Sequence, residues 1–302
     1  MSIPPEHPAG RARVGYLGPE GTFTEEALLS SAIAEAVEPV AQVTIYDTVT
    51  ALRVGEVDWA VAPIENSLEG SINVTLDLLA GGPADVEIVG EALVRVRHSL
   101  IACAQIGLER IETVLTHPQV PGQCTNFLRE ELGHARVLAA SSTAEAVRTV
   151  VSEGRPGQAA LGTLLAAKIY GGTVLREGVE DREDNETRFV WLARTGEAVP
   201  APLANAIGEW KTSLVFWGLG AEQPGWLLRC LEEFARRDIN LTRIESRPLR
   251  GGLGTYMFFI DLAGGSAQAR VAEAITALRA HCEEVRVLGS YRAAVAPERE
   301  AA

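Results

Sequence analysis

Short apolar runs alternate with helical patterns from Arg13 onward, and this alternation is typical of an α/β protein. The apolar runs predict strands at Val14–Leu17, Asp58–Ile64, Val86–Ala102, Thr113–Thr116, Ala135–Ala139, Gln158–Leu161 and Arg188–Ala193. The segments between them predict helices around 24–36, 71–80, 123–131, 143–153 and 163–170. The first part of the chain is therefore expected to belong to the α/β class.

The pattern changes after Lys211. Strands are expected at Thr212–Trp217, Asn240–Arg247, Gly254–Leu262 and about 285–291, with helices at Trp226–Arg236 and about 267–280. This order is βαββαβ, the ferredoxin-like split unit. The stretch Thr195–Glu209 before it has two prolines and little periodicity, which is typical of a linker. We therefore expect a first domain over residues 11–195, a linker over 196–210 and a second domain over 211–293.

Composition narrows the possible partners. Of 302 residues, 27 are basic and 40 acidic, which gives a net charge of −13 with no basic block. Nucleic acid and membrane are therefore not expected as partners. The four cysteines form no C-x-x-C pair, and the histidines lack metal-ligand spacing, so we expect reduced thiols and no metal. The N-terminus has no signal-peptide pattern and no apolar run reaches about 18 residues, so a cytoplasmic protein is expected.

The first polar cluster is Gly18–Glu25, between a predicted strand and a predicted helix. Thr22 and Glu25 have the spacing of a capping box. The free N–H groups of such a turn can bind an anion, although an ordinary capped turn has the same sequence pattern. The glycines do not match the dinucleotide-binding spacing.

Three further polar clusters stand at predicted strand ends, where ligands bind in open α/β sheets. Pro63–Ser71 offers Asn66 and Ser67, or simply helix caps. Thr116–Cys124 offers Thr116, His117 and Gln123. Glu183–Trp191 places Thr187 and Arg188 at the start of a strand, which by itself also fits a solvated acidic loop. Since no Ser-His-Asp, metal or phosphate motif accompanies them, the four clusters together predict a cofactor-free cleft for a small polar molecule.

These motifs, in order, resemble prephenate dehydratase: GPEGTFTEEA, PIENSLEGSINVTLDLL, THPQVPGQC, STAEAV and DNETRFVWLAR. NLTRIESRP followed by GTYMFFIDLAG resembles the ACT regulatory domain of that family. The resemblance spans about residues 13 to 292. It implies a bilobal, periplasmic-binding-protein-like catalytic domain that turns prephenate into phenylpyruvate, water and carbon dioxide without a cofactor, and an ACT domain with L-phenylalanine as feedback inhibitor.

The resemblance also implies roles for particular residues. The catalytic threonine falls on Thr187, and Thr116 and Gln123 fall on the hydroxyl and the amide of a second catalytic motif. Arg188 is expected to clamp a carboxylate, because its planar fork matches carboxylate geometry. The remaining residues expected to bind substrate are Thr22, Phe23, Asn66, Ser67 and Phe189.

The expected effector site lies in the second domain. It comprises Asn240, Leu241, Glu245, Ser246, Arg247, Pro248, Gly225 and Trp226. Trp226 stands where the family usually has a small residue, so the phenylalanine response is an open question. A homodimer or homotetramer is expected, because ACT modules commonly pair side by side. Two alternatives remain at this point: an arogenate dehydratase, and an amino-acid sensor without catalysis.

Overall fold

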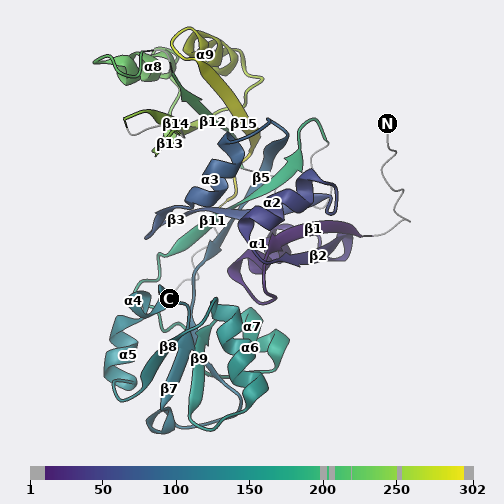
Figure 1. Cartoon of the computed structure of the whole chain (residues 1–302), viewed down its shortest axis with the longest axis vertical. Helices are drawn as coiled ribbons and strands as arrows, with labels where there is room; N and C mark the ends of the chain where they lie inside the picture. Colours follow the sequence, from purple (N-terminus) through teal and green to yellow (C-terminus); the bar gives the residue numbers. More distant parts are fainter. Residues whose placement is uncertain (1–10, 198–202, 204–207, 219, 250–253, 296–302) are drawn as a thin grey trace.

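The computed structural model describes residues 11–197, 203, 208–218, 220–249 and 254–295. Three parts follow one another along the longest axis of the molecule (Figure 1). We call residues 12–95 with 186–197 the first lobe, residues 99–176 the second lobe, and residues 208–295 the C-terminal module. The first lobe lies between the other two parts (Figure 1), so it is the part that both of them can influence.

The first lobe is built on the larger of two sheets. Its strands β1 and β2 run parallel, β1 also pairs in parallel with β3, and β11 lies antiparallel between β3 and β5. Helix α1 packs on one face, and α2 and α3 pack on the other. The bounds are β1 Ala12–Leu17, α1 Phe23–Ser31, a 3-10 turn Ala34–Ala36, β2 Val37–Gln42, α2 Ile45–Arg53, β3 Trp59–Asn66, β4 Gly70–Ser71, α3 Asn73–Ala80, β5 Val86–Arg95 and β11 Glu186–Arg194.

The second lobe is a five-stranded sheet with the strand order β10-β6-β9-β7-β8. Helices α4 and α5 contribute to the core on one face, and α6 and α7 to the core on the other. The chain crosses between the lobes at residues 96–98 and 177–185. The bounds are β6 Ser99–Ala102, a 3-10 turn Leu108–Arg110, β7 Thr113–Thr116, α4 Val120–Gln123, α5 Thr125–Glu131, β8 Arg136–Ala139, α6 Thr143–Glu153, β9 Gln158–Gly162, α7 Leu164–Tyr170 and β10 Thr173–Arg176.

The C-terminal module continues the larger sheet, in the order β13-β14-β12-β15-β5. The joint is a parallel pairing of Gly289 with Ile88, where a Cβ on Gly289 would lie 2.1 Å from the Ile88 carbonyl oxygen. Only glycine permits this close approach. The module runs β12 Trp210–Trp217, α8 Trp226–Ala235, β13 Leu241–Pro248, β14 Tyr256–Ala263, α9 Ala269–Arg279 and β15 Glu284–Arg292.

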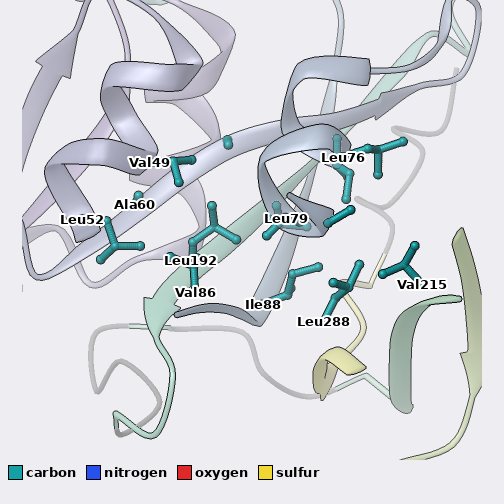
Figure 2. Packing of buried hydrophobic residues seen from close by; sticks show 14 of the residues in the cluster. Val49, Leu52, Ala60, Leu76, Leu79, Val86, Ile88, Leu192, Val215 and Leu288 are labelled. Carbon is teal, nitrogen blue, oxygen red and sulfur yellow. The ribbon is translucent and has the colours of Figure 1, made fainter. Parts of the chain in front are cut away.

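The first lobe and the module also share a hydrophobic core. Helices α8 and α9 cover one face of the module sheet. The other face brings Val215 and Leu288 into the cluster that contains Leu76, Leu79 and Ile88 (Figure 2). Burial of apolar surface is the main favourable term in folding, so the two parts stabilise each other and the module is not an independent appendage.

The α/β class predicted from the sequence is confirmed, and the six elements of the module follow one another as expected. Three expectations were wrong. The predicted strand 86–102 is two strands, because the chain passes between the lobes at 96–98. The predicted helix 24–36 ends at Ser31. Strands β2, β4 and β10 and helix α2 were missed; in β2 only Val37 is buried, so its apolar pattern is weak. Within the described residues, no helix is long and apolar enough to cross a bilayer.

Candidate active site

A cavity of about 280 Å³ opens between the two lobes. The first lobe contributes the N-terminus of α1 and the ends of β3 and β11, and the second lobe contributes α4 and the N-terminus of α6. Its lining residues are Leu17, Thr22, Phe23, Thr24, Pro63, Asn66, Glu69, Ile72, Val96, His98, His117, Gln119, Val120, Gln123, Ser141, Ser142, Thr143, Thr187 and Phe189. Each of the four polar clusters found in the sequence brings a side chain named there to the lining: Thr22, Asn66, Gln123 and Thr187.

The Asn66 side chain determines how the Thr187 hydroxyl is oriented. The Asn66 Oδ1 atom accepts hydrogen bonds from the backbone N–H groups of Leu68 and Glu69, each at 2.9 Å. Its amide nitrogen must therefore point the other way, and it donates to Thr187 Oγ1 at 2.9 Å and to Asn185 Oδ1 at 2.8 Å. Because Thr187 Oγ1 accepts this bond, the proton of the Thr187 hydroxyl remains available for a ligand.

The same chain of hydrogen bonds continues to the second lobe. Since Asn185 accepts with its oxygen, it donates with its amide nitrogen to Gln123 Oε1 at 3.1 Å. The Gln123 nitrogen donates to Glu69 at 2.9 Å, and Gln119 donates to the same carboxylate. We call Glu69, Gln119 and Gln123 the interlobe latch, because they join the lobes across one side of the cavity.

His98 completes this network. Its Nε2 atom lies 3.1 Å from Gln123 Oε1. Because that oxygen can only accept, His98 carries its proton on Nε2, which leaves Nδ1 buried without a hydrogen-bond partner. Burial lowers the pKa of His98 below its usual range, and this effect exceeds the opposing effects of the bond to Gln123 and the Glu180 charge. His98 is therefore neutral at neutral pH.

Two helix N-termini face the cavity from opposite lobes. Thr22 caps α1 and Ser142 caps α6, each by accepting from the backbone N–H three residues later. In the part of the chain that the structure describes, the N–H groups of Phe23, Thr24, Thr143 and Ala144 donate to no other group. Free N–H groups at a helix start favour an anion. Among the described residues, no arginine or lysine lines this cavity, so these dipoles are its electropositive groups.

The structure does not place Arg188 in the cavity. Successive side chains of a strand point to opposite faces, so Thr187 and Phe189 line the cavity while Arg188 points behind it. Arg188 is buried there against Asp261 at 2.7 Å, with Glu65 and Glu91 at 3.2 and 3.3 Å. Burial by itself would lower the pKa of Arg188, but these carboxylates more than offset it and raise that pKa. Arg188 therefore does not face the cavity, and the expectation that it clamps a substrate carboxylate was wrong.

Two further expected residues do not line the cavity. Thr116 is only 1% exposed, and its hydroxyl donates to the Leu161 carbonyl at 3.0 Å in the neighbouring strand. Ser67 accepts from the Glu186 N–H at 3.0 Å and donates to the carbonyl of Asp184 in the crossover at 3.3 Å. Both residues support the site from outside. In contrast, Phe23 lines the cavity and packs edge-on against His98, with ring centroids 5.7 Å apart.

The sequence-based reasoning did not assign a role to several residues of the site. His98 lies in the crossover 96–98, inside a stretch that the sequence predicted as one strand. Glu69 and Asn185 stand within the polar clusters, but without any signal of their partners. A break in apolar character at Arg97 and His98 was the one available sign that the predicted strand is interrupted.

The profile of one protein family, described as prephenate dehydratase, matches residues 14–197. The chain belongs to the prephenate dehydratase family. It is 40% identical over 280 residues to prephenate dehydratase from Amycolatopsis methanolica, covering 93% of this chain and 88% of that protein. The crystal structure of prephenate dehydratase from Arthrobacter aurescens in complex with L-Phe has 35% identity and a TM-score of 0.82, covering 96% of this chain and 92% of the other.

The prephenate dehydratase relationship identifies the chain as an enzyme. A second similar structure, described as a quorum-quenching acylase named GqqA, has 29% identity and a TM-score of 0.80, and covers 93% of this chain and 98% of that one. Acyl transfer by a hydroxyl nucleophile needs a base within hydrogen-bond reach. Among the described residues that line the cavity, no hydroxyl is hydrogen-bonded to a histidine, so the geometry favours the prephenate dehydratase reaction.

The expected effector residues lie on two faces of the module. Glu245 accepts from Ser71 at 2.8 Å and Arg247 donates to Asp77 at 2.8 Å, so both side chains face the first lobe. Asn240, Ser246 and Pro248 are exposed, and Leu241 is half-buried at the strand start. Gly225 has a φ of 78° and precedes α8. Trp226 is 3% exposed in the module core, and its Nε1 donates to the His281 carbonyl at 2.7 Å.

A pH-dependent stability follows from His98. Its pKa is lowered by folding, so below about pH 6.5 the unfolded chain binds more protons at this residue, and acidification should destabilise the fold. His98→Gln keeps a donor near the Nε2 position but does not titrate. We expect the melting temperature of this variant to fall less than that of the wild type between about pH 7.5 and about pH 5.5. Exposed His134 provides the control: His134→Gln should behave as wild type. Equal pH dependence in wild type and His98→Gln would contradict the argument.

Proposed function

We propose that the chain converts prephenate into phenylpyruvate, water and carbon dioxide in phenylalanine biosynthesis, with Thr187 as the group that assists departure of the ring hydroxyl. The observation that carries this proposal is the direction of the hydrogen bond from Asn66 to Thr187 Oγ1. The hydroxyl is held as an acceptor toward Asn66, and its own proton is free to be donated into the cavity.

The reaction needs little covalent chemistry from the protein. The carbon–carbon bond to the ring carboxylate breaks and releases carbon dioxide, and its electron pair forms a ring double bond. The ring hydroxyl departs with the electrons of its own bond and takes up one proton from solvent to become water. The product ring is aromatic. A threonine is a weak acid, so a hydrogen bond from Thr187 to the departing oxygen is the appropriate role. Such assistance is strongest in a cavity that excludes water, and Thr187 is 9% exposed.

Prephenate carries two carboxylates, and two helix N-termini face this cavity. We propose that Phe23 and Thr24 in α1 bind one carboxylate through their N–H groups, and that Thr143 and Ala144 in α6 bind the other. Because α1 belongs to the first lobe and α6 to the second, a substrate held at both ends would align the reacting ring with Thr187. Asn66 and Gln123 would then orient the ring and the hydroxyl.

A second candidate substrate is arogenate, in which an amino group replaces the side-chain keto group. Glu69 favours it, since this carboxylate lines the cavity and could pair with an ammonium group. The deciding assay is turnover of each substrate by the purified protein, with phenylpyruvate read by its absorbance in base and phenylalanine by chromatography. Binding of either compound without turnover would instead indicate an amino-acid sensor without catalysis.

We further propose that the C-terminal module is an ACT regulatory domain with L-phenylalanine as its effector. Its element order and the Glu245–Pro248 motif support this assignment, as does the solved relative in complex with L-Phe. The exposed face of β13, which includes Ser246 and the 49% exposed Ile244, is our proposed ligand surface. β13 ends the sheet order, so a second copy pairing there would complete the site. Trp226 is buried in the module core, where its ring centroid lies 5.9 Å from that of Phe258, the cross-strand partner of Ser246.

Loss of the Thr187 hydroxyl should damage chemistry more than binding. We expect Thr187→Val to lower kcat by about 10²–10⁴, with a much smaller change in KM, because one group that acts in the transition state is lost. Thr187→Ser should retain more activity, since it keeps the hydroxyl. Steady-state kinetics of both variants provide the measurement. A valine variant as active as wild type would remove Thr187 from the mechanism.

Asn66 offers a test of the hydrogen-bond direction itself. In Asn66→Asp one oxygen still accepts from Leu68 and Glu69, but the other now meets Thr187 as an acceptor. The Thr187 proton would then be donated to this carboxylate and not to the substrate. We expect kcat to fall by about 10²–10³, the usual cost of losing one preorganised donor. Asn66→Ala, which leaves the hydroxyl free, should retain more activity. An aspartate variant that equals or exceeds the alanine variant would contradict the direction of the bond.

Phenylalanine regulation can be localised with one exposed residue. L-Phenylalanine should inhibit the wild-type enzyme, and Ile244→Glu should raise the concentration for half-maximal inhibition about tenfold, because a charge replaces an apolar contact. Tyr46→Glu changes an exposed side chain of the first lobe and serves as the control. Inhibition that is identical in wild type and Ile244→Glu would place the effector elsewhere.

A further inference from the structure

A cluster of buried charges lies directly behind the catalytic residues. Arg188 and Glu65 are cross-strand partners on β11 and β3, and the next pair along these strands is Thr187 with Asn66. The register of the two strands shifts immediately after Arg188. Irregularities of this kind change the direction of neighbouring side chains, so the geometry of Thr187 depends on how Arg188 is held.

Arg188 is held by three carboxylates from three strands. Glu65 comes from β3 and Glu91 from β5, while Asp261 comes from β14 of the C-terminal module. The side chains of Arg188, Glu91 and Asp261 are 9%, 1% and 3% exposed. Lys211, also from the module, donates to Glu91 at 2.7 Å. The cluster therefore joins the module to the catalytic strands through charges that are almost completely buried.

Asp261 is fixed on its own side as well. Its second oxygen accepts from Ser213 at 2.5 Å, and Ser213 Oγ lies 2.8 Å from the Tyr291 hydroxyl. Removing one partner of a buried pair leaves an uncompensated charge, which is strongly unfavourable. Any displacement of β14 relative to β11 must therefore disturb the pairing or move Arg188 with it, and Arg188 carries Thr187.

We propose that Arg188 is a positioning residue and that Asp261 of the C-terminal module, through it, sets the orientation of the Thr187–Asn66 pair. The module thus contributes to the catalytic rate in the absence of any effector. This inference rests on the proposed function, because its readout is turnover of prephenate.

Asp261→Asn provides the direct test in the full-length protein. Asparagine keeps the shape and an oxygen that can accept from Ser213, but it removes the charge that binds Arg188. We expect kcat to fall by about 3–30-fold, the range found for coupling through packed networks, with KM changed less than about twofold. Arg188→Lys, which keeps the charge and loses the planar fork, should have the same effect on kcat.

Arg286 supplies a matched control. It is a half-buried arginine that also joins the module to the first lobe, through bonds of 3.0 and 3.2 Å to the Ala80 and Gly82 carbonyls. Its Nε, like that of Arg188, has no hydrogen-bond partner. Because its hydrogen bonds go to Ala80 and Gly82 and its ion pair to Glu284, none of which belongs to β11 or β3, Arg286→Lys should lower the melting temperature and leave kcat unchanged. An equal loss of kcat in this variant would show that any weakening of the interface is sufficient, and it would overturn the proposal.

The double variant Arg188→Met/Asp261→Asn separates positioning from stability. Removing both charges relieves the unpaired carboxylate, so its melting temperature should exceed that of Arg188→Met. If Arg188 positions Thr187, kcat should remain low in this double variant. Recovery of kcat together with stability would reject the proposal. If Arg188→Met does not fold, the near-isosteric Asp261→Asn carries the test. An inactive wild type would refute the proposed function, whereas an active wild type with an equally active Asp261→Asn refutes only this inference.

Discussion

The hydrogen bond from Asn66 to Thr187 is the interaction on which the site depends. Its direction is set by backbone, since the N–H groups of Leu68 and Glu69 both point at the Asn66 oxygen. The next side chains in this network of hydrogen bonds are Asn185, Gln123 and His98. In each of them, the donor and acceptor atoms are fixed by the bond to the preceding residue. One short turn after β3 therefore determines the donors and acceptors of a network that reaches into the second lobe.

Strand alternation on β11 places neighbouring residues in different surroundings. Thr187 and Phe189 face the cavity, and Arg188 faces the buried cluster with Asp261. The C-terminal module reaches this strand because it extends the same sheet and shares the same core, through residues such as Val215 and Leu288. A rigid sheet transmits displacement along its hydrogen-bonded strands more directly than a flexible linker would, and this continuity supports the proposal that the module influences the cavity face of β11.

Sequence patterns could predict the strand ends but not the partners of each side chain. Asn66, Gln123 and Thr187 were found because polar clusters at strand ends converge in an α/β sheet, and the cavity does contain them. Arg188 could not be assigned in this way, because its side chain points to the buried face of β11 and pairs there with Asp261, which lies 73 positions away in the chain. His98 belongs to no recognisable sequence motif. Its lowered pKa results from burial, and its proton position is set by the hydrogen bond to Gln123. The shared sheet depends on one close contact at Gly289, which no local pattern reveals.

In the proposed binding mode, the placement of charge explains how an acidic protein with a net charge of −13 can accept a dianion. Arg188, the arginine nearest to Thr187 in sequence, is used to neutralise Glu91 and Asp261. The cavity is left with peptide N–H groups at two helix starts, which do not titrate and whose attraction declines within a turn of the helix. Binding at both ends therefore depends on the separation of the lobes and not on the protonation of a side chain.

The interlobe latch of Glu69 with Gln119 and Gln123 bridges that separation. The carboxylate that holds the lobes together is therefore also the negative charge that an incoming anion meets. A substrate dianion must therefore gain more from the two helix starts than it loses near Glu69, which favours ligands long enough to reach both.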